Sequence, residues 1–393
     1  MVLGIRPDVI RASLMIKRLK KELGSNFIFI WSGQHYSDNM KDVFFQQLDV
    51  PRPDITLELK KTSDFEMIGD LTQKLGAVLQ DIKPEAVIFL GDTNTVTSSL
   101  AAASLDIPIV HIEGCMRSYD WRMPEEKYRT TIDHLADIIY AYFDEYKNQG
   151  LLEGLEANRI IVTGNPIVDV LQEYFLSGKI RFSEKELTDY RNSLGIDSQS
   201  YWVMTAHRRE NVESQSALTE ILNLARSVKE PVIFPAGYRT QQQITKFNLT
   251  VPKNAKLMDP IGYIELLELV MGCTGILTDS GTLVEEAAVL GVPAIQMRTS
   301  TERPQVYDTG GCIKFDPHQM HSEDNRQKLI AATKSRHGAM DPHNLGDGLA
   351  SERIVDDLLD RLNRDDWSGH KPDPKARPID RNFGYGLSNR GKV

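Results

Sequence analysis

Short apolar runs that read as β-strands alternate with helical patterns along most of this 393-residue chain. In the first helical pattern Ile10, Leu14 and Leu19 share one face, Gly24 can end the helix, and the apolar run 27–31 follows. Such alternation is typical of a parallel sheet that helices cover on both faces. The chain is also longer than a single hydrophobic core usually supports. We therefore expect an α/β fold with two facing Rossmann-like domains.

The predicted strands fall into two series. The first comprises 27–31, 86–90, 107–111 and 159–162, and the second comprises 201–204, 231–234, 275–277 and 292–295. We expect an N-terminal domain over 1–166, a C-terminal domain over 167–350, a helix over 351–364 and an extended polar tail over 365–393. Two facing domains of this kind place the active-site cleft between the carboxyl ends of their strands.

Composition argues against several classes of partner. The formal net charge of −9 disfavours binding to a nucleic-acid backbone. No apolar run reaches the roughly 20 residues that span a bilayer, and no signal-peptide pattern opens the chain, so we expect no direct membrane role. Cys115, Cys273 and Cys312 are odd in number and far apart, without metal-like pairing, which favours the reduced cytoplasm.

The segment 278–288 predicts a strand that runs into a helix able to hold a phosphate group. Ser280 is placed to cap this helix, and Gly281 lets a ligand approach the backbone. Amides of the first turn have no helical partner and point outward at the positive end of the helix dipole. Glu286, about one and a half turns further on, can accept hydrogen bonds from ribose hydroxyls. Taken alone, the segment fits an ordinary capped helix equally well.

Charged residues also follow the predicted strands of the N-terminal domain. Arg6 and Arg11 open the first helix and can neutralise a diphosphate, although a surface arginine pair would look the same. Asp92 and Glu113 each follow a strand, where a carboxylate would point into the cleft, and Asp92 also suits a helix N-cap. Glu125 comes after a helix-opening proline and is either a further cleft carboxylate or a partner of the helix dipole.

In the C-terminal domain, His207 and Arg208 follow the first predicted strand. A histidine beside arginines tends to stay neutral, which suits hydrogen bonding or proton exchange near a leaving phosphate. A lone histidine in a loop is more often structural. Arg298 and the segment 301–304 are expected to converge on the same rim, which favours the functional interpretation.

Together these segments resemble the UDP-N-acetylglucosamine 2-epimerase family, in order and in spacing, from residue 2 to about residue 362. The matching segments are 4–8, 91–93, 111–113, 124–126, 207–211, 278–286 and 301–304. The resemblance implies a glycosyltransferase-B-type fold in which the second domain holds most of the UDP. It also implies a UDP-sugar substrate, no cofactor, no metal and a homodimer.

By the same resemblance, Asp92, Glu113, Glu125 and His207 occupy catalytic positions. The positions expected to bind the UDP-sugar are Arg6, Arg11, Arg129, Arg208, Tyr263, Ser280, Gly281, Thr282, Glu286 and Arg298. Tyr263 is expected to flank the uracil, although a structural aromatic residue fits that position almost as well.

The activity that the resemblance implies is non-hydrolysing 2-epimerisation of UDP-N-acetylglucosamine to UDP-N-acetylmannosamine, for synthesis of a surface polysaccharide or glycan precursor. In the family, UDP leaves across C1–C2 to give a 2-acetamidoglycal, carboxyl groups exchange the C2 proton, and UDP returns. One alternative is a 2-epimerase of a modified UDP-2-acetamido sugar, of the 6-deoxy-L-talose or diacetamido uronic acid type, to which 123–137 is also similar. Others are a hydrolysing 2-epimerase, a retaining glycosyltransferase and a non-catalytic UDP-sugar sensor.

Four positions depart from the family pattern. Cys115 and Thr282 replace glycine, Tyr128 replaces asparagine, and Gly237 replaces a histidine of the second domain. The catalytic candidates are all kept. The departures therefore bear on substrate identity and on activation by bound UDP-sugar.

Overall fold

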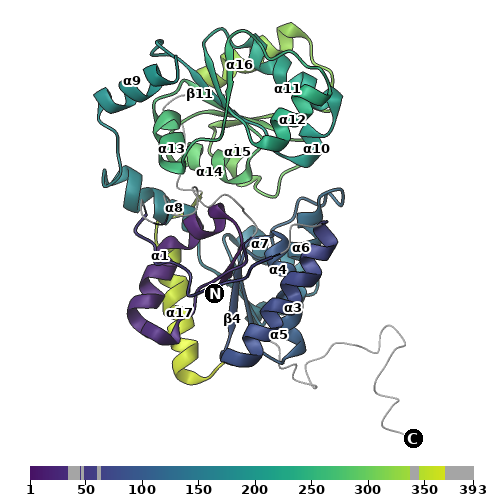
Figure 1. Cartoon of the computed structure of the whole chain (residues 1–393), viewed down its shortest axis with the longest axis vertical. Helices are drawn as coiled ribbons and strands as arrows, with labels where there is room; N and C mark the ends of the chain where they lie inside the picture. Colours follow the sequence, from purple (N-terminus) through teal and green to yellow (C-terminus); the bar gives the residue numbers. More distant parts are fainter. Residues whose placement is uncertain (34–44, 46–47, 60–62, 337–344, 368–393) are drawn as a thin grey trace, which may run out of the picture.

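The computed structural model describes residues 1–33, 45, 48–59, 63–336 and 345–367. Figure 1 shows two lobes, with the N-terminal lobe in purple and blue below and the C-terminal lobe in green above. Each lobe is built around a parallel sheet, which confirms the expected α/β class with two Rossmann-like domains. Most of the expected polar tail, 368–393, lies outside the described residues.

The N-terminal sheet has seven strands in the order β3-β2-β1-β4-β5-β6-β7. Its strands are β1 (Val2–Leu3), β2 (Ile30–Trp31), β3 (Ile55–Thr56), β4 (Val87–Leu90), β5 (Ile109–Ile112), β6 (Ile138–Ala141) and β7 (Ile160–Val162). After β3, at one edge of the sheet, the chain returns to the middle and forms β4 beside β1. The strand order therefore reverses between β1 and β4, which creates a switch point at the carboxyl ends of these two strands.

The C-terminal sheet repeats this pattern with six strands in the order β10-β9-β8-β11-β12-β13. Its strands are β8 (Trp202–Thr205), β9 (Val232–Pro235), β10 (Ala255–Met258), β11 (Gly275–Thr278), β12 (Ala294–Met297) and β13 (Cys312–Phe315). The switch point here lies between β8 and β11, the strands that precede His207 and Ser280.

Helices cover both faces of each sheet. In the N-terminal lobe these are α1 (Arg6–Leu23), α3 (Asp64–Ile82), α4 (Asn94–Thr97), α5 (Ser99–Ser104), α6 (Pro124–Leu135), α7 (Asp144–Leu152) and α17 (Ala350–Arg364), with short turns η1 (Gly24–Asn26) and η2 (Ala157–Arg159). The linking segments α8 (Pro166–Leu171), η3 (Gln172–Leu176) and α9 (Glu184–Ser193) lead to α10 (Arg209–Val212), α11 (Gln215–Ser227), α12 (Tyr238–Lys246), α13 (Tyr263–Met271), α14 (Gly281–Val289), α15 (Gln305–Asp308) and α16 (Glu323–Lys334). No helix in the described ranges is both long and apolar enough to cross a membrane.

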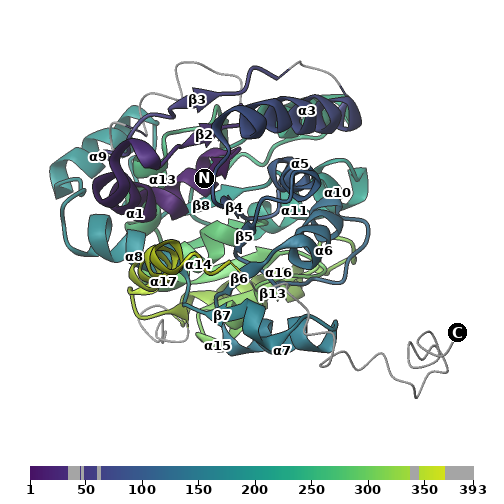
Figure 2. The same ribbon diagram turned by 90° about the horizontal axis from the view of Figure 1, so that it is seen from below.

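The first and last helices of the described chain pack together. α1 ends where the sequence predicts, because Gly24 takes a φ of +57° that residues with a side chain seldom adopt. α17 packs against α1 and α8, so the chain returns to the N-terminal lobe after completing the C-terminal sheet. Figure 2 shows α1 and α17 on one face of the N-terminal sheet and α3, α5 and α6 on the other.

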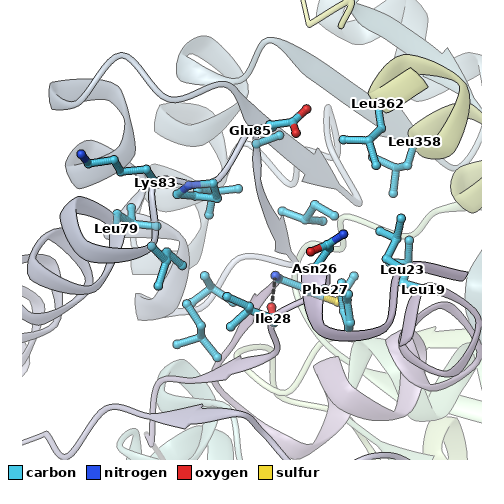
Figure 3. Close-up of a pocket in the computed structure, with 18 of the residues that line it drawn as sticks. Leu19, Leu23, Asn26, Phe27, Ile28, Leu79, Lys83, Glu85, Leu358 and Leu362 are labelled. Atoms are coloured by element: carbon cyan, nitrogen blue, oxygen red, sulfur yellow. Dashed lines mark hydrogen bonds between the residues drawn. The ribbon is translucent and has the colours of Figure 1, made fainter. Parts of the chain in front are cut away.

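A hollow of about 550 Å³ lies beside the N-terminal sheet, at the amino-terminal ends of its strands (Figure 3). Apolar side chains from three helices line it, including Leu19 of α1, Leu79 of α3 and Leu358 of α17. Met1 also lines this hollow, and its amino group donates a hydrogen bond to the carbonyl oxygen of Ile28 at 2.8 Å. The carboxyl ends of the strands, where ligands of such sheets bind, lie at the opposite edge.

Candidate active site

A cleft of about 1200 Å³ lies between the lobes, at the carboxyl ends of both sheets. Residues that line it from the N-terminal lobe include Arg11, Asp92, Glu113 and Glu125, and those from the C-terminal lobe include His207, Arg208, Ser280, Gly281, Thr282 and Arg303. Most of the predicted site residues therefore share one cleft. The remaining predicted positions, Arg6, Arg129, Tyr263, Glu286 and Arg298, stand outside this lining.

α14 begins at the cleft, as the sequence predicts. Ser280 is its N-cap, and the Ser280 hydroxyl accepts a hydrogen bond from the amide of Leu283 at 3.2 Å. A Cβ atom at Gly281 would lie 2.8 Å from Nε of Arg303, so glycine lets the arginine pack against the first turn. The amides of the first turn and the helix dipole suit an anion such as a diphosphate, and Arg303 beside them is itself paired with carboxylates.

Glu286 lies further along α14 and is buried. The hydroxyl of Tyr263 donates a hydrogen bond to Oε1 of Glu286 at 2.7 Å, and burial raises the pKa of this carboxyl group to about 7. The charge of Glu286 acts on Arg6 at the start of α1 in the other lobe, where burial lowers the pKa of the guanidinium. Tyr263 thus holds Glu286, and its contact with uracil stays a prediction.

Glu113 is held by cations from both lobes. It is 4% exposed, and it pairs with Arg11 of α1 and with Arg303, whose Nη2 lies 2.7 Å from Oε1 of Glu113. The Tyr142 hydroxyl donates a further hydrogen bond to Oε2 at 2.8 Å. Arg303 also reaches Glu285 of α14 at 3.0 Å. These partners fix the position of the Glu113 carboxyl group, and Arg303 links it to α14.

Asp92 is held in its ionised form by Arg129. Burial by itself would raise the pKa of Asp92, but the charges of Arg129 and Arg208 outweigh it and the pKa is lowered. Nη1 of Arg129 donates a hydrogen bond to Glu126 at 2.9 Å, so this buried arginine supports Asp92 from behind the cleft wall. The N-cap of α4 is Thr93, and the alternative interpretation of Asp92 as a cap is therefore wrong.

Glu125 and its neighbour Glu126 differ in environment although both lie in the first turn of α6. Glu126 is buried and accepts hydrogen bonds from the backbone amides of Ser118 and Tyr119 at 3.0 and 2.7 Å. Glu125 faces the cleft and makes no hydrogen bond or ion pair within the part of the chain that the structure describes. Its charge acts on Arg208 across the cleft.

His207 reaches the cleft from the loop after β8. Its side chain is 53% exposed, and Nδ1 lies 3.2 Å from Oδ1 of the fully buried Asp279. Asp279 also accepts the backbone amides of His207 and Arg208 at 3.0 and 2.9 Å, which fixes the loop. Arg298 lies deeper, where Nη2 pairs with Glu302 at 2.8 Å, and supports the rim without lining it.

Two of the residues that hold Glu113 were not predicted as site residues. Tyr142 directly follows β6, a strand that the sequence does not predict, so the strand-end rule that indicates Asp92 and Glu113 could not identify it. Arg303 lies in the segment expected at the rim, but its pairing with Glu113 and Glu285 depends on how the lobes dock. No local sequence pattern encodes that contact.

Comparisons with known proteins identify the family of the chain. A family model described as UDP-N-acetylglucosamine 2-epimerase matches residues 17–359. A UDP-N-acetylglucosamine 2-epimerase of Methanocaldococcus jannaschii is 35% identical over 367 residues, covering 90% of this chain and 96% of that protein. A UDP-2,3-diacetamido-2,3-dideoxy-D-glucuronate 2-epimerase of Pseudomonas aeruginosa is 31% identical, covering 91% of this chain and 98% of that protein.

The fold agrees as well. The crystal structure of the Methanocaldococcus jannaschii UDP-GlcNAc 2-epimerase in complex with UDP-GlcNAc and UDP matches with a TM-score of 0.80 at 34% identity, covering 91% of this chain and 98% of that one. Sequence and fold thus correspond over nearly the whole of both proteins. The chain belongs to the UDP-N-acetylglucosamine 2-epimerase family, whose members are isomerases.

Proposed function

We propose that the protein is a non-hydrolysing 2-epimerase that converts UDP-N-acetylglucosamine into UDP-N-acetylmannosamine. One observation carries the proposal: the carboxylates Asp92, Glu113 and Glu125 line the same cleft as the helix N-terminus at Ser280. A diphosphate held at Ser280 would leave the attached sugar among groups able to move a proton.

In the proposed reaction the C1–O bond to the diphosphate breaks, UDP leaves with the electron pair, and a carboxylate takes the C2 proton. The remaining 2-acetamidoglycal is planar at C2. UDP can then return to C1 while another carboxyl group delivers a proton to the opposite face of C2. The leaving anion requires positive charge, which Arg11, Arg303 and the first amides of α14 supply.

The carboxyl groups are suited to different parts of this reaction. Asp92 and Glu113 are paired with arginines, so either can serve as a base once the substrate displaces part of that pairing. Glu125 has no such partner among the described residues and lines the cleft, where a substrate can reach it. We propose Glu125 as one of the two proton carriers and Glu113 or Asp92 as the other.

Proton NMR of the protein incubated with UDP-N-acetylglucosamine tests this function. The expected result is a new anomeric signal from UDP-N-acetylmannosamine that reaches a constant ratio to the substrate. Free N-acetylmannosamine with UDP would instead identify a hydrolysing epimerase. An unchanged spectrum would contradict both reactions for this substrate.

A diacetamido uronate is the second candidate substrate, because the Pseudomonas aeruginosa relative carries that activity in its name at 31% identity. The uronate carboxylate would require a cation, and Arg122, Arg209 and Arg239 also line the cleft. Values of kcat/KM for the two UDP-sugars, measured side by side, distinguish the substrates.

We further propose that the enzyme acts in the cytoplasm as a homodimer and supplies a precursor of a surface polysaccharide or glycan. Cys115, Cys273 and Cys312 are buried free thiols, as is usual in a reducing compartment. Light scattering coupled to size exclusion tests the dimer, and a monomer at working concentration would contradict it.

A further inference from the structure

Behind the cleft wall, a fully buried histidine joins the segments that carry Asp92 and Glu113. His111 lies in β5, where Nδ1 is 2.7 Å from Oδ1 of Asp133 in α6. Its Nε2 is 2.8 Å from the carbonyl oxygen of Gly91, the residue that follows β4. A carbonyl oxygen only accepts hydrogen bonds, so Nε2 must carry a hydrogen.

The other ring nitrogen faces an ionised carboxylate. Oδ2 of Asp133 accepts hydrogen bonds from the amide of Cys115 at 2.9 Å and from Nη1 of Arg117 at 2.6 Å. Arg117 and Asp133 form a buried ion pair, which keeps this carboxylate ionised independently of His111. Nδ1 must therefore donate as well, which makes His111 an imidazolium.

The charges around this imidazolium alternate in sign. Arg117, on the far side of Asp133, pairs with Glu153 at 2.7 Å. Arg159 reaches the same helix end and donates a hydrogen bond to the carbonyl oxygen of Asp133 at 2.8 Å. The positive His111 thus belongs to a chain of paired charges, which is how buried charges are tolerated in proteins.

Two hydrogen bonds to the backbone fix the chain beside two catalytic candidates. His111 donates one to the carbonyl oxygen of Gly91, and Asp133 accepts the other from the amide of Cys115. Gly91 immediately precedes Asp92, and Cys115 follows Glu113 by two residues. Glu113 and Cys115 have φ values of +77° and +63°, a conformation that is unfavourable for residues other than glycine and needs support.

Gly114 shows how closely the turn lies against the pair. A Cβ atom there would come within 2.8 Å of Oδ1 of Asp133, 3.2 Å of Nδ1 of His111 and 2.2 Å of Ile139. The backbone between Glu113 and Cys115 therefore rests directly on the imidazolium–carboxylate pair.

We propose that His111 and Asp133 are positioning residues: an oppositely charged, hydrogen-bonded pair that holds the Asp92 and Glu113 carboxylates in their reactive arrangement. Neither His111 nor Asp133 lines the cleft, and the catalytic consequence of the pair rests on the proposed function. Loss of the His111–Asp133 pair should lower turnover and leave UDP affinity unchanged. The proposed diphosphate site is at the N-terminus of α14, which belongs to the other lobe.

Nitrogen NMR of the histidine rings tests the charge on the ligand-free wild-type protein, whatever its substrate. Both ring nitrogens of His111 should carry a hydrogen, because Nδ1 faces the Asp133 carboxylate and Nε2 faces a carbonyl oxygen. A His111 ring with only one protonated nitrogen would overturn the proposal, even if epimerisation is intact.

His111→Gln and Asp133→Asn test the positioning. Each should lower kcat by about 10- to 100-fold, as a small displacement of catalytic groups does, while KM and UDP affinity stay near the wild-type values. His321→Gln is the matched control: Nε2 of His321 also faces a backbone carbonyl, that of Asp316, at 2.8 Å, but outside the cleft lining. Calorimetry with UDP confirms that each variant is folded.

Normal kcat in both variants, or an equal loss in the control, would refute the positioning role, whereas an inactive wild-type protein would refute the proposed function alone.

Discussion

At the scale of single residues, the cleft contains two kinds of carboxyl group. Asp92 and Glu113 are paired with arginines, whereas Glu125 lines the cleft without an ion pair to any described residue. The sequence indicated all three because each follows a strand or opens a helix. It could not distinguish them, because their partners come from distant segments of the chain.

Glu125→Gln should abolish most turnover and leave UDP binding intact. A positioned acid or base typically contributes on the order of 100-fold or more to the rate, and the amide can neither take nor give the proton. Steady-state kinetics and UDP calorimetry measure the two effects. Glu145→Gln, an exposed glutamate in the first turn of α7, is the control and should behave as wild type. Near-normal turnover in Glu125→Gln would remove this residue from the mechanism.

UDP affinity should depend on the ionisation of Glu286. Burial raises the pKa of this group to about 7, so it is mostly protonated below that pH and ionised above it. The ionised form accepts stronger hydrogen bonds from the ribose hydroxyls than the protonated form does, so affinity should rise as the pH increases through about 7. In Glu286→Gln this contribution should vanish and affinity should fall roughly 10- to 150-fold at higher pH. Any effect of the ionisation of UDP itself is the same for the wild-type protein and for Glu286→Gln. UDP affinities that change with pH in parallel in these two proteins would therefore mean that Glu286 does not bind the ribose.

At the scale of elements, local patterns were sufficient for some segments and not for others. The cap at Ser280 and the glycine at the end of α1 depend on a few neighbouring residues, and both predictions hold. β6 was not predicted, because only two residues separate it from α6 and the apolar run reads as more helix. The sequence also does not predict β10 and β13. Both are edge strands with mixed exposure, so they lack the continuous apolar run of the central strands.

The first turn of α14 yields a prediction at this scale. In Gly281→Ala the new methyl group would lie 2.8 Å from Nε of Arg303 and 2.9 Å from Oε1 of Glu302, so the arginine must move away from the helix N-terminus. UDP affinity should fall about tenfold, as expected for loss of one charged contact. Gly69→Ala in α3, where a methyl group meets nothing within 4 Å, is the control and should bind UDP normally. Equal UDP affinity in the two variants would contradict the proposed diphosphate site.

At the scale of the whole molecule, the lobes meet through polar contacts across the cleft. Arg303 reaches Glu113, the Tyr146 hydroxyl donates to Gln305 at 2.6 Å, and Ser300 donates to Asp120 at 3.1 Å. The sequence predicted a cleft from the position of the strand ends. It could not predict these pairings, since they exist only once two separately folded sheets are docked.

Arg303→Gln should loosen this docking. Removing one partner of a buried ion pair typically costs about 3–5 kcal/mol, and here it leaves both Glu113 and Glu285 short of a cation. We expect a larger radius of gyration in small-angle scattering and a lower midpoint of chemical unfolding. Arg326→Gln breaks an ion pair with Glu220 inside the C-terminal lobe and should leave the radius unchanged. An unchanged radius in Arg303→Gln would show that this contact does not hold the lobes together.

The central claim is that the cleft removes and returns the proton on C2 of a UDP-2-acetamido sugar. Incubation of the wild-type protein with UDP-N-acetylglucosamine in deuterated water, followed by NMR of C2, measures this directly. The account predicts deuterium at C2 in both the product and the recovered substrate, with UDP attached and no added metal or nicotinamide. Product that keeps its C2 hydrogen, or recovered substrate without any deuterium at C2 once equilibrium is reached, would contradict it.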